Sequence, residues 1–234
     1  MLTLCYTLYN PKPETINAHL TNWIHCNEEL RKQFKVVFVD DCSPTTPTVP
    51  LDFHMNMTVA RIKDDIYWNL TGARNLAFHL ADDDWCVTTD MDHFIEPEDL
   101  QKIVDMEKNR QFVYYFERYR NGKPHRTHLD SYIMHKQDFL NMGGYDEDMR
   151  GHRGANEDLI KAIIEYNNYH KVQTDIKIHN DESHGKVGGP RREMVMPNYV
   201  KLRQKLGQMK NGMYKNSKSL RFDWEILDEY TYPE

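Results

Sequence analysis

The sequence predicts a single α/β domain built on a doubly wound, mixed β-sheet and followed by a basic C-terminal tail. In the first half, short apolar runs alternate with segments of helical spacing, a pattern typical of parallel strands joined by helices. In the middle, the Asn121-Gly122 pair between two apolar runs indicates an antiparallel turn, so the sheet should be mixed. The 234 residues contain no internal repeat and no low-complexity linker, which favours one domain. We expect its main unit over 1–185 and a basic extension over 186–234, packed on the same domain.

The first half of the chain is predicted to alternate strands and helices. Strands are expected where apolar residues run together over a few positions and end in polar ones. Helices are expected where apolar residues recur every three or four positions, or where a proline followed by acids opens the segment, as at Pro97. The expected strands are 2–9, 35–41, 57–62 and 85–89, and the expected helices are 13–31, 69–82 and one that begins at Pro97.

The second half is less regular. The runs "QFVYYFERYR" and "SYIMHK" flank the Asn121-Gly122 turn and are predicted to be strands. The stretch "NMGGYDEDMRGHRGANED" is predicted to be a glycine-rich loop that leads into a helix over 157–166. "VQTDIKIH" is predicted to be the last strand, ending at His179. The remaining tail is expected to be basic and partly helical.

The composition is that of a polar globular protein, with 39% hydrophobic and 28% charged residues. No apolar run approaches the roughly 20 residues that a membrane helix needs. The N-terminal "MLTLCYTLYN" lacks the basic region and the cleavage site of a signal peptide. The four cysteines form no C-x-x-C pair, which favours reduced thiols. The sequence therefore predicts a cytoplasmic protein.

Charge is distributed unevenly along the chain. The net charge is −6, yet the segment 186–221 carries ten Lys and Arg residues against one acid, Glu193. Two interpretations stay open for this segment: a solvated basic helix face, or a surface that meets a phosphate-bearing ligand or an anionic membrane. A nucleic-acid partner is not expected.

Acids and a histidine follow the predicted strands at three points. In an open α/β sheet, ligands bind at the carboxyl ends of the strands. Those ends carry Asp40-Asp41, Asp90-x-Asp92 and His179. Side chains two residues apart on a strand point to the same side, so Asp90 and Asp92 should aim two carboxylates at one place. Carboxylates this close repel each other unless a cation or a proton intervenes. Two carboxylates and an imidazole suit Mn²⁺ or Mg²⁺, which can also hold a diphosphate.

Several common signatures of nucleotide and metal sites are absent from the sequence. The chain contains no G-x-x-x-x-G-K-[ST], no G-x-G-x-x-G after the first strand and no H-E-x-x-H. Neither a P-loop nucleoside triphosphatase nor a classical dinucleotide-binding fold is therefore supported. Diphosphate binding through D-x-D and a metal remains.

Three segments resemble the GT-A glycosyltransferases, especially the large inverting family 2. "VVFVDDCSPT" resembles the V-D-D-x-S segment that follows the second strand of that family. "GARNLAFHLADDDWCVTTDMDHFIEP" is similar to its A-R-N helix, D-x-D strand and proline-started helix, and "FLNMGGYDEDMRGHRGANEDL" is similar to its G-G-[FY]-D-E loop and E-D motif. A lone D-x-D is a weak signal, but here the order and spacing of all three segments hold over residues 1 to about 180.

The resemblance implies a role for each matching residue of the nucleotide site. Asp41, with Asp40 behind it, would hydrogen-bond the nucleotide base. Thr7 and Tyr9, at the end of the first strand, would lie along the nucleotide. Arg74, from the A-R-N helix, would face the nucleotide or its phosphates.

Around the D-x-D motif, the resemblance implies contacts with the donor and the metal. Asp90 would contact the ribose or the metal, through water, and Met91 would lie beside it in the nucleotide site. Asp92 would ligate the metal directly. His179 would be the third metal ligand, and His184 is the rival candidate.

The resemblance also implies a reaction. Asp158 would be the catalytic base, and Glu157 would position the acceptor. The donor would be a nucleotide-sugar, with a UDP-sugar expected, and the acceptor would be a hydroxyl of a glycan, a lipid-linked molecule or a protein. Mn²⁺ or Mg²⁺, helped by Lys186, Arg191 and Arg192, would stabilise the departing nucleoside diphosphate, and the attack would invert the anomeric carbon.

The stretch 186–192 is interpreted as a lid. Its glycines permit a hinge and its cations attract phosphate, so it could order over the diphosphate. The wider segment 186–221 could instead contact an anionic membrane surface.

Ordinary structural roles stay open beside the functional ones. Acids such as Glu157 and Asp158 are favoured in the first turn of any helix. Asp40 and Asp41 could form an Asx turn with Ser43. In the same way, helix capping would account for Asp90 and Asp92, a surface position for Arg74, and a structural hydrogen bond for His179.

Two further functions also stay open. A sugar-nucleotidyltransferase would need a glycine- and arginine-rich loop after the first strand, where this chain has "YTLYNPKPET". A non-catalytic binding module of the same fold would keep the aspartates and lack turnover. A measurement of UDP release separates the enzyme from the module.

Overall fold

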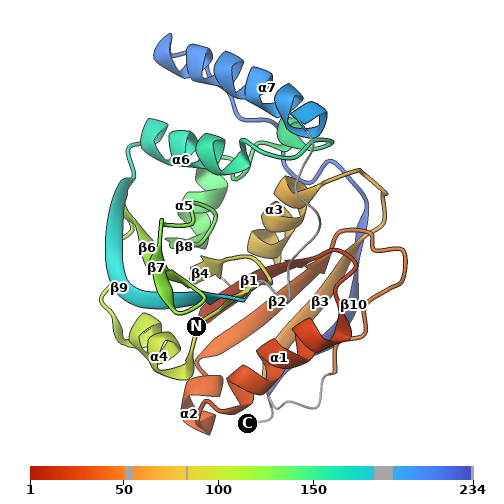
Figure 1. Ribbon diagram of the computed structural model, residues 1–234, viewed down its shortest axis with the longest axis vertical. Helices are drawn as coiled ribbons and strands as arrows, with labels where there is room; N and C mark the ends of the chain where they lie inside the picture. The colour runs from red at the N-terminus through yellow and green to blue at the C-terminus, as the bar shows by residue number, and fades with distance from the viewer. Residues whose placement is uncertain (51–54, 83, 182–191, 233–234) are drawn as a thin grey trace.

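A mixed β-sheet of ten strands runs through the centre of the computed structural model, which describes residues 1–50, 55–82, 84–181 and 192–232 (Figure 1). In that part of the chain the strands are β1 (Leu2–Leu8), β2 (Phe34–Asp40), β3 (Asn56–Ile62), β4 (Trp85–Thr88), β5 (His93–Phe94), β6 (Phe112–Arg120), β7 (Lys123–His125), β8 (Tyr132–His135), β9 (His170–Asn180) and β10 (Trp224–Tyr230). Their order in the sheet is β10-β3-β2-β1-β4-β8-β6-β9-β5, and β7 pairs with β6. The predicted mixed sheet is confirmed.

The strands β1, β2, β3 and β4 run parallel to one another, and this arrangement determines where the site lies. β1 pairs in parallel with β2 from Leu2↔Phe34 to Leu8↔Asp40, and it pairs in parallel with β4 on its other side. Parallel strands end at the same edge of a sheet, so the residues that follow β1, β2 and β4 lie together. β8 and β6 then continue the sheet in antiparallel pairs.

Helices cover both faces of the sheet (Figure 1). One hydrophobic cluster joins one face to α1 (Pro13–Ile24), α2 (Glu28–Arg31) and α4 (Pro97–Asp105). A second cluster joins the other face to α3 (Leu70–Leu80), α5 (Lys136–Asn141) and α6 (Asn156–Tyr166). The short 3₁₀ helix η1 (Glu147–Met149) precedes α6, and α7 (Arg192–Lys210) packs beside α6 at the top of Figure 1. This layering is the predicted doubly wound arrangement.

The helix predicted over 13–31 is divided in two. α1 ends at Ile24, and α2 begins after Asn27, whose side chain accepts a hydrogen bond of 2.8 Å from the backbone N–H of Leu30. Asn at an N-cap satisfies an N–H that has no partner within its own helix, so it starts a new helix inside a continuous apolar pattern. Leu30 remains buried in either arrangement.

The prediction that the last strand ends at His179 is wrong. β10 follows it and pairs antiparallel with β3, from Trp224↔Ile62 to Tyr230↔Met57. Most side chains of this edge strand are exposed, so its sequence lacks the apolar run that reveals a buried strand. The end of the tail therefore belongs to the central sheet.

Two further findings concern the wider properties of the chain. Among the described residues, no helix combines the length and apolar character needed to cross a bilayer. All four cysteines, Cys5, Cys26, Cys42 and Cys86, are free thiols.

Candidate functional site

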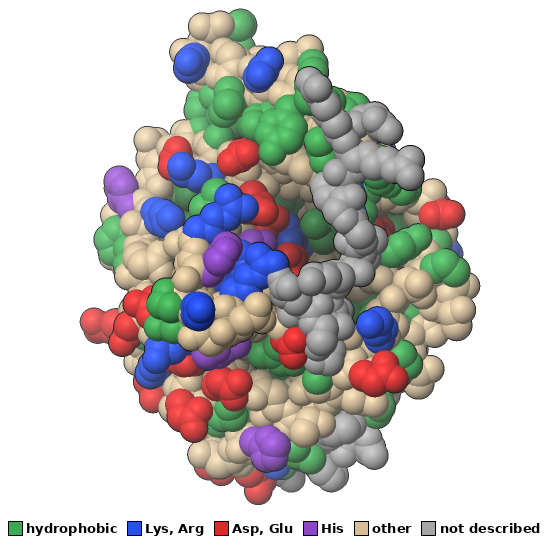
Figure 2. Space-filling model, viewed as in Figure 1, with side chains coloured by type: hydrophobic (Ala, Val, Ile, Leu, Met, Phe, Trp, Pro, Cys, Tyr) green, Lys and Arg blue, Asp and Glu red, His purple; other side chains and the backbone are tan. Residues whose placement is uncertain are grey.

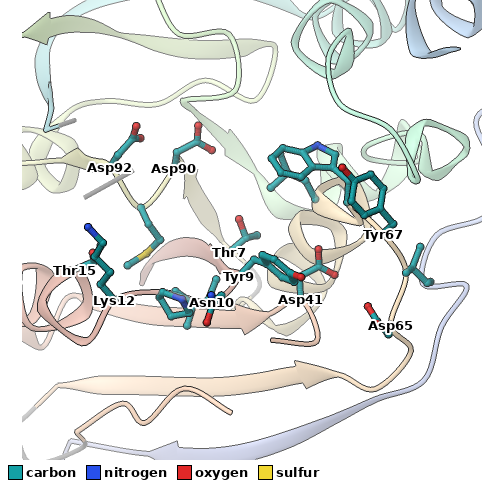
Figure 3. A pocket seen from close by; sticks show the side chains of 16 residues that line it. Thr7, Tyr9, Asn10, Lys12, Thr15, Asp41, Asp65, Tyr67, Asp90 and Asp92 are labelled. Carbon is teal, nitrogen blue, oxygen red and sulfur yellow. The ribbon is translucent and has the colours of Figure 1, made fainter. Parts of the chain in front are cut away.

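A cavity of about 560 Å³ opens at the carboxyl ends of β1 and β4 (Figure 3). Its walls come from the residues after β1, the start of α1, the loop before α3 and the turn after β4. Six of the predicted site residues line it: Thr7, Tyr9, Asp41, Asp90, Met91 and Asp92. In Figure 3 the carboxylates of Asp90 and Asp92 point to the same side of the turn, as their spacing predicts.

Asp40 and Asp41 have different surroundings although they are adjacent. Asp40 is fully buried, accepts a hydrogen bond of 3.2 Å from the backbone N–H of Ser43, and pairs with Arg61 at 2.5 Å. Asp41 lines the cavity; its Oδ2 accepts a hydrogen bond of 3.1 Å from the backbone N–H of Asn69, while its buried Oδ1 has no partner among the described residues. Burial, supported by the charge of Asp40, raises the pKa of Asp41 to about 7. Asp40 thus stabilises the turn at Ser43, as the structural interpretation predicted. Asp41 keeps one carboxylate oxygen that can accept a hydrogen bond from a ligand.

Arg74 holds Asp90 from inside the protein. Its side chain is 1% exposed, and its two terminal nitrogens lie 2.5 Å from Asp90 and 2.5 Å from Asp130. Burial works against the charge of Arg74, but the two acids outweigh it and raise its pKa. Arg74 does not line the cavity, so the structure does not support the predicted contact between Arg74 and a nucleotide. Its contacts make it a positioning residue for Asp90.

Asp90, His93 and His128 form a cluster that can hold a metal ion. Each offers one ligand atom, and these atoms lie within 4.8 Å of one another. His128 Nε2 is 3.4 Å from Asp90 Oδ2, and the two imidazole rings stack with their centroids 4.7 Å apart. Ser131 Oγ lies 2.7 Å from His128 Nδ1. A hydrogen bond at one ring nitrogen orients the other toward a metal, so Ser131 supports the His128 position.

The protonation states in this cluster suit a divalent cation. Within the described part of the chain, neither ring nitrogen of the buried His93 forms a hydrogen bond, although Asp92 Oδ1 lies 2.7 Å from Nδ1. Burial lowers the pKa of His128, which favours the neutral imidazole that metals bind. Burial opposes ionisation of Asp90, but Arg74 and the two histidines hold its pKa well below its usual range. A buried imidazole nitrogen without a hydrogen-bond partner is costly unless a ligand satisfies it, so these residues fit a metal.

The predicted third metal ligand, His179, points away from this cluster. In the antiparallel pair of β5 with β9, His93 lies opposite Asn180, and Phe94 lies opposite His179. Residues opposite each other share a face of the sheet and neighbours along a strand alternate, so His179 and His93 lie on opposite faces. The His179 ring instead contacts Tyr119, with 5.6 Å between the centroids.

The predicted metal ligand Asp92 contacts one member of the cluster, His93, and is not itself a member. It also lines the cavity, and its contact is with His93 Nδ1. His184, Lys186 and Arg191 lie outside the described residues, as does the side chain of Arg192. The predicted lid over 186–192 therefore stays a prediction.

The E-D motif begins α6. Ala155 precedes the helix with a left-handed backbone (φ 63°), and the first turn carries Glu157 and Asp158. Glu157 is half-buried, with Oε1 3.9 Å from His128 Nε2, and burial, with Asp130 and Asp90 nearby, raises its pKa. Asp158 is exposed to solvent. The loop before α6 thus brings Glu157 to the cluster of Asp90, His93 and His128.

Several residues of the site were not identified from the sequence. His93 directly follows the D-x-D motif, a signal that was available, whereas His128 and Asp130 lie in an irregular segment before β8 whose position depends on the tertiary fold. Tyr67 and Trp68 line the cavity from the loop before α3. Their signal was an aromatic pair between a strand and a helix at the ligand edge of the sheet.

A family comparison covers most of the described domain. Residues 15–171 match the family model described as Glycosyl transferase family 2. A protein of Haemophilus influenzae, described as an uncharacterized glycosyltransferase, is 26% identical over 118 residues, which are 49% of this chain and 38% of that protein. The chain thus spans well under half the length of this curated relative.

Solved structures share the fold at low identity. GalNAc-T7, solved with UDP, GalNAc and Mn²⁺, matches 92% of this chain and 49% of its own, with a TM-score of 0.66 and 12% identity. TarS residues 1–349 of S. aureus match 76% of this chain and 60% of their own, with a TM-score of 0.58 and 14% identity. TarS 1–349 in complex with UDP-GlcNAc gives a TM-score of 0.58 at 13% identity, over 79% of this chain and 59% of its own.

Proposed function

The chain belongs to glycosyltransferase family 2, and from this premise we propose that it transfers a sugar from a nucleotide-sugar to an acceptor hydroxyl. The observation that carries the proposal is one cavity with two different ends. At one end, the Asp41 carboxylate has a buried oxygen without a partner among the described residues; at the other, Asp90 belongs to a cluster suited to a divalent cation. A nucleoside diphosphate needs a base contact and a charge contact of these two kinds.

We propose a UDP-sugar as the donor. Asp41 Oδ1 can accept the imino N–H of a uracil, which would satisfy its missing hydrogen bond. Tyr9 and Tyr67 are more than half exposed and line the same cavity, so either ring can stack on the base. The neighbouring folds were solved with UDP or UDP-GlcNAc, which supports this donor class.

We propose that Asp90, His93 and His128 hold a divalent cation, with Asp92 beside them. A bound cation would neutralise the diphosphate of the donor and of the leaving group. Two imidazoles in the cluster favour Mn²⁺ over Mg²⁺, since Mg²⁺ prefers oxygen ligands. The Mn²⁺ in the GalNAc-T7 structure supports this choice.

We propose that Asp158 takes the proton from the acceptor hydroxyl, and that attack on the anomeric carbon inverts its configuration. The exposed carboxylate of Asp158 is accessible from solvent. Glu157 Oε1 lies 3.9 Å from His128 Nε2, and we assign Glu157 the positioning of the acceptor beside the base. The cation side of the site holds the donor, and the first turn of α6 holds the acceptor.

The test is UDP release from a panel of UDP-sugars with Mn²⁺, with Asp158→Asn as the variant. Removal of a general base should lower the turnover number by at least about 100-fold while the affinity for UDP changes little. Glu157→Gln should instead raise the KM for the acceptor more than it lowers the turnover number. Tight UDP binding by the wild type without any turnover would support a binding module instead of an enzyme.

Metal removal tests the cation site separately. Calorimetry should find that Mn²⁺ tightens UDP binding by at least about tenfold, and more than Mg²⁺ does. His93→Ala should abolish that gain, whereas His79→Ala, which removes an exposed histidine of α3, should preserve it. An equal affinity for UDP with Mn²⁺ and with EDTA would refute the cation site.

A further inference from the structure

Cations gather on the β6–β7 hairpin and the segment that follows it. Between residues 117 and 128 the chain carries Arg118, Arg120, Lys123 and Arg126 against one acid, Glu117. On the face shown in Figure 2, Lys, Arg and His side chains group near the middle, beside acidic ones. The proposed reaction described so far does not use these cations.

Arg118 lies beside the carboxylates of the site. Asp92, Asp90 and Glu157 are the carboxylates whose charges act on it, but in the described chain none forms an ion pair with it. Its Nε is buried and has no hydrogen-bond partner there, and burial lowers its pKa. A half-buried guanidinium with an unsatisfied donor is stabilised when an anion reaches it.

Arg126 directly follows β7 and is the neighbour of His125, which pairs with Arg118 across the hairpin. It is exposed, it lies two residues before His128, and its charge acts on Glu157. No ion pair joins it to another described residue. Arg118 and Arg126 therefore both interact electrostatically with Glu157, the residue proposed to position the acceptor.

The hairpin is separate from the nucleotide cavity. The walls of that cavity come from the end of β1, the loop before α3 and the turn after β4, and no residue of β6 or β7 lines it. Arg118 and Arg126 therefore lie outside the wall of the cavity that Asp41 lines. A ligand group that binds there would belong to the acceptor, which reacts with the donor sugar, and not to the nucleoside of the donor.

We propose that Arg118 and Arg126 form a subsite for an anionic group of the acceptor, a phosphate or a carboxylate. The inference rests on the proposed function and adds the chemical class of the acceptor. Two guanidinium groups, one on the hairpin and one directly after it, match the paired oxygens of such an anion. A neutral acceptor would leave the buried Nε of Arg118 unsatisfied.

The experiment compares the binding of neutral and anionic forms of the same acceptor in the presence of UDP, the product formed from the donor. The labelled full chain, with UDP and Mn²⁺, is applied to an array that pairs each neutral glycan with a carboxylated and a phosphorylated form. Anionic forms should bind at least tenfold more strongly than their neutral counterparts. Arg118→Gln and Arg126→Gln should each reduce this preference to less than threefold, and Arg203→Gln, a charge-matched change on α7, should keep it.

Calorimetry with UDP and Mn²⁺ separates this subsite from the donor site. Both hairpin variants should keep the affinity for UDP within twofold of the wild type, and the exposed position of Arg126 ensures that one variant retains the fold. A loss of tenfold or more in UDP affinity would assign the arginines to the donor diphosphate and overturn the acceptor subsite. A wild type that binds UDP but shows no anionic preference would also overturn it, leaving the proposed function intact. Failure to bind UDP at all would instead refute the proposed function.

Discussion

At the scale of single residues, burial gives neighbouring acids different properties. Asp40 is satisfied by Ser43 and Arg61, whereas Asp41 keeps an oxygen without a partner among the described residues and a pKa raised to about 7. The adjacency of two aspartates predicted a site, but it did not indicate which carboxylate faces the cavity. That difference arises because successive side chains at a strand end point in different directions.

The raised pKa of Asp41 predicts a pH-dependent stability. The folded protein holds the Asp41 proton more tightly than the unfolded chain, so this contribution favours folding below about pH 4 and is lost as the pH rises to about 7. Between pH 5 and 8, the unfolding free energy of the wild type should fall by about 2 kcal/mol relative to that of Asp41→Asn. Urea denaturation of both proteins at the two pH values measures the difference. Parallel pH profiles would show that Asp41 titrates normally.

At the scale of elements, one side chain of α3 holds the glycine-rich loop before the E-D motif in place through hydrogen bonds. Asn75 donates hydrogen bonds of 2.9 Å to the carbonyl of Tyr145 and to Glu147, and it accepts one of 2.8 Å from the Tyr145 N–H. Its neighbour Arg74 holds Asp90 on the other side. α3 therefore links the turn after β4 to the loop before α6, and it sets the position of both halves of the site.

This close approach predicts unequal costs for two glycine substitutions. Gly144 has φ 64°, and a Cβ there would lie 2.5 Å from Asn75 Oδ1 and 2.8 Å from a ring carbon of Phe139. Gly151 also has a positive φ (86°), but a Cβ would meet nothing within 4 Å. Gly151→Ala should cost about 1 kcal/mol of stability from its backbone alone, and Gly144→Ala about 3 kcal/mol because it also clashes.

The two glycine variants control for each other, because both carry the same backbone penalty. Chemical denaturation gives the two free energies of unfolding. Equal values would mean that the loop moves away from Asn75 without cost, and the role of Asn75 in holding it in place would be wrong.

At the scale of the whole molecule, the basic C-terminal segment is divided between internal pairing and an exposed face. Lys205 pairs with Asp146 at 2.5 Å and with Asp148 at 3.0 Å, and Arg221 pairs with Asp148 at 2.8 Å. These cations hold the tail against the loop before α6. On α7, Met196, Tyr199 and Val200 are exposed on the same side as Arg203. Part of the segment is thus used for internal ion pairs, and both interpretations stay open for the exposed face of α7.

The exposed face of α7 predicts binding to anionic vesicles. Apolar side chains next to cations are typical of helices that lie on lipid surfaces, where each cation contributes about 1 kcal/mol. We expect the protein to co-sediment with phosphatidylserine vesicles and not with phosphatidylcholine vesicles, and to be released by salt.

Charge reversal tests the residues behind that contact. Arg203→Glu with Lys210→Glu should weaken vesicle binding by at least fivefold, whereas Lys63→Glu, an exposed change next to β3, should leave it unchanged. If the wild type remains in the supernatant with both lipids, α7 has another role.

The sequence by itself determined most of the strands and helices and the ligand edge of the sheet, because these follow from local apolar periodicity and from residues that neighbour each other in the chain. It therefore indicated Asp41 and Asp90, and it indicated the family through three motifs in their order. Only the tertiary structure decided the partners of Asp90, since Arg74, His93 and His128 come from separate elements. It also decided that His179 points away, and that β10 completes the sheet from a segment without an apolar run. Such pairings depend on register and packing between distant segments, which no local pattern encodes.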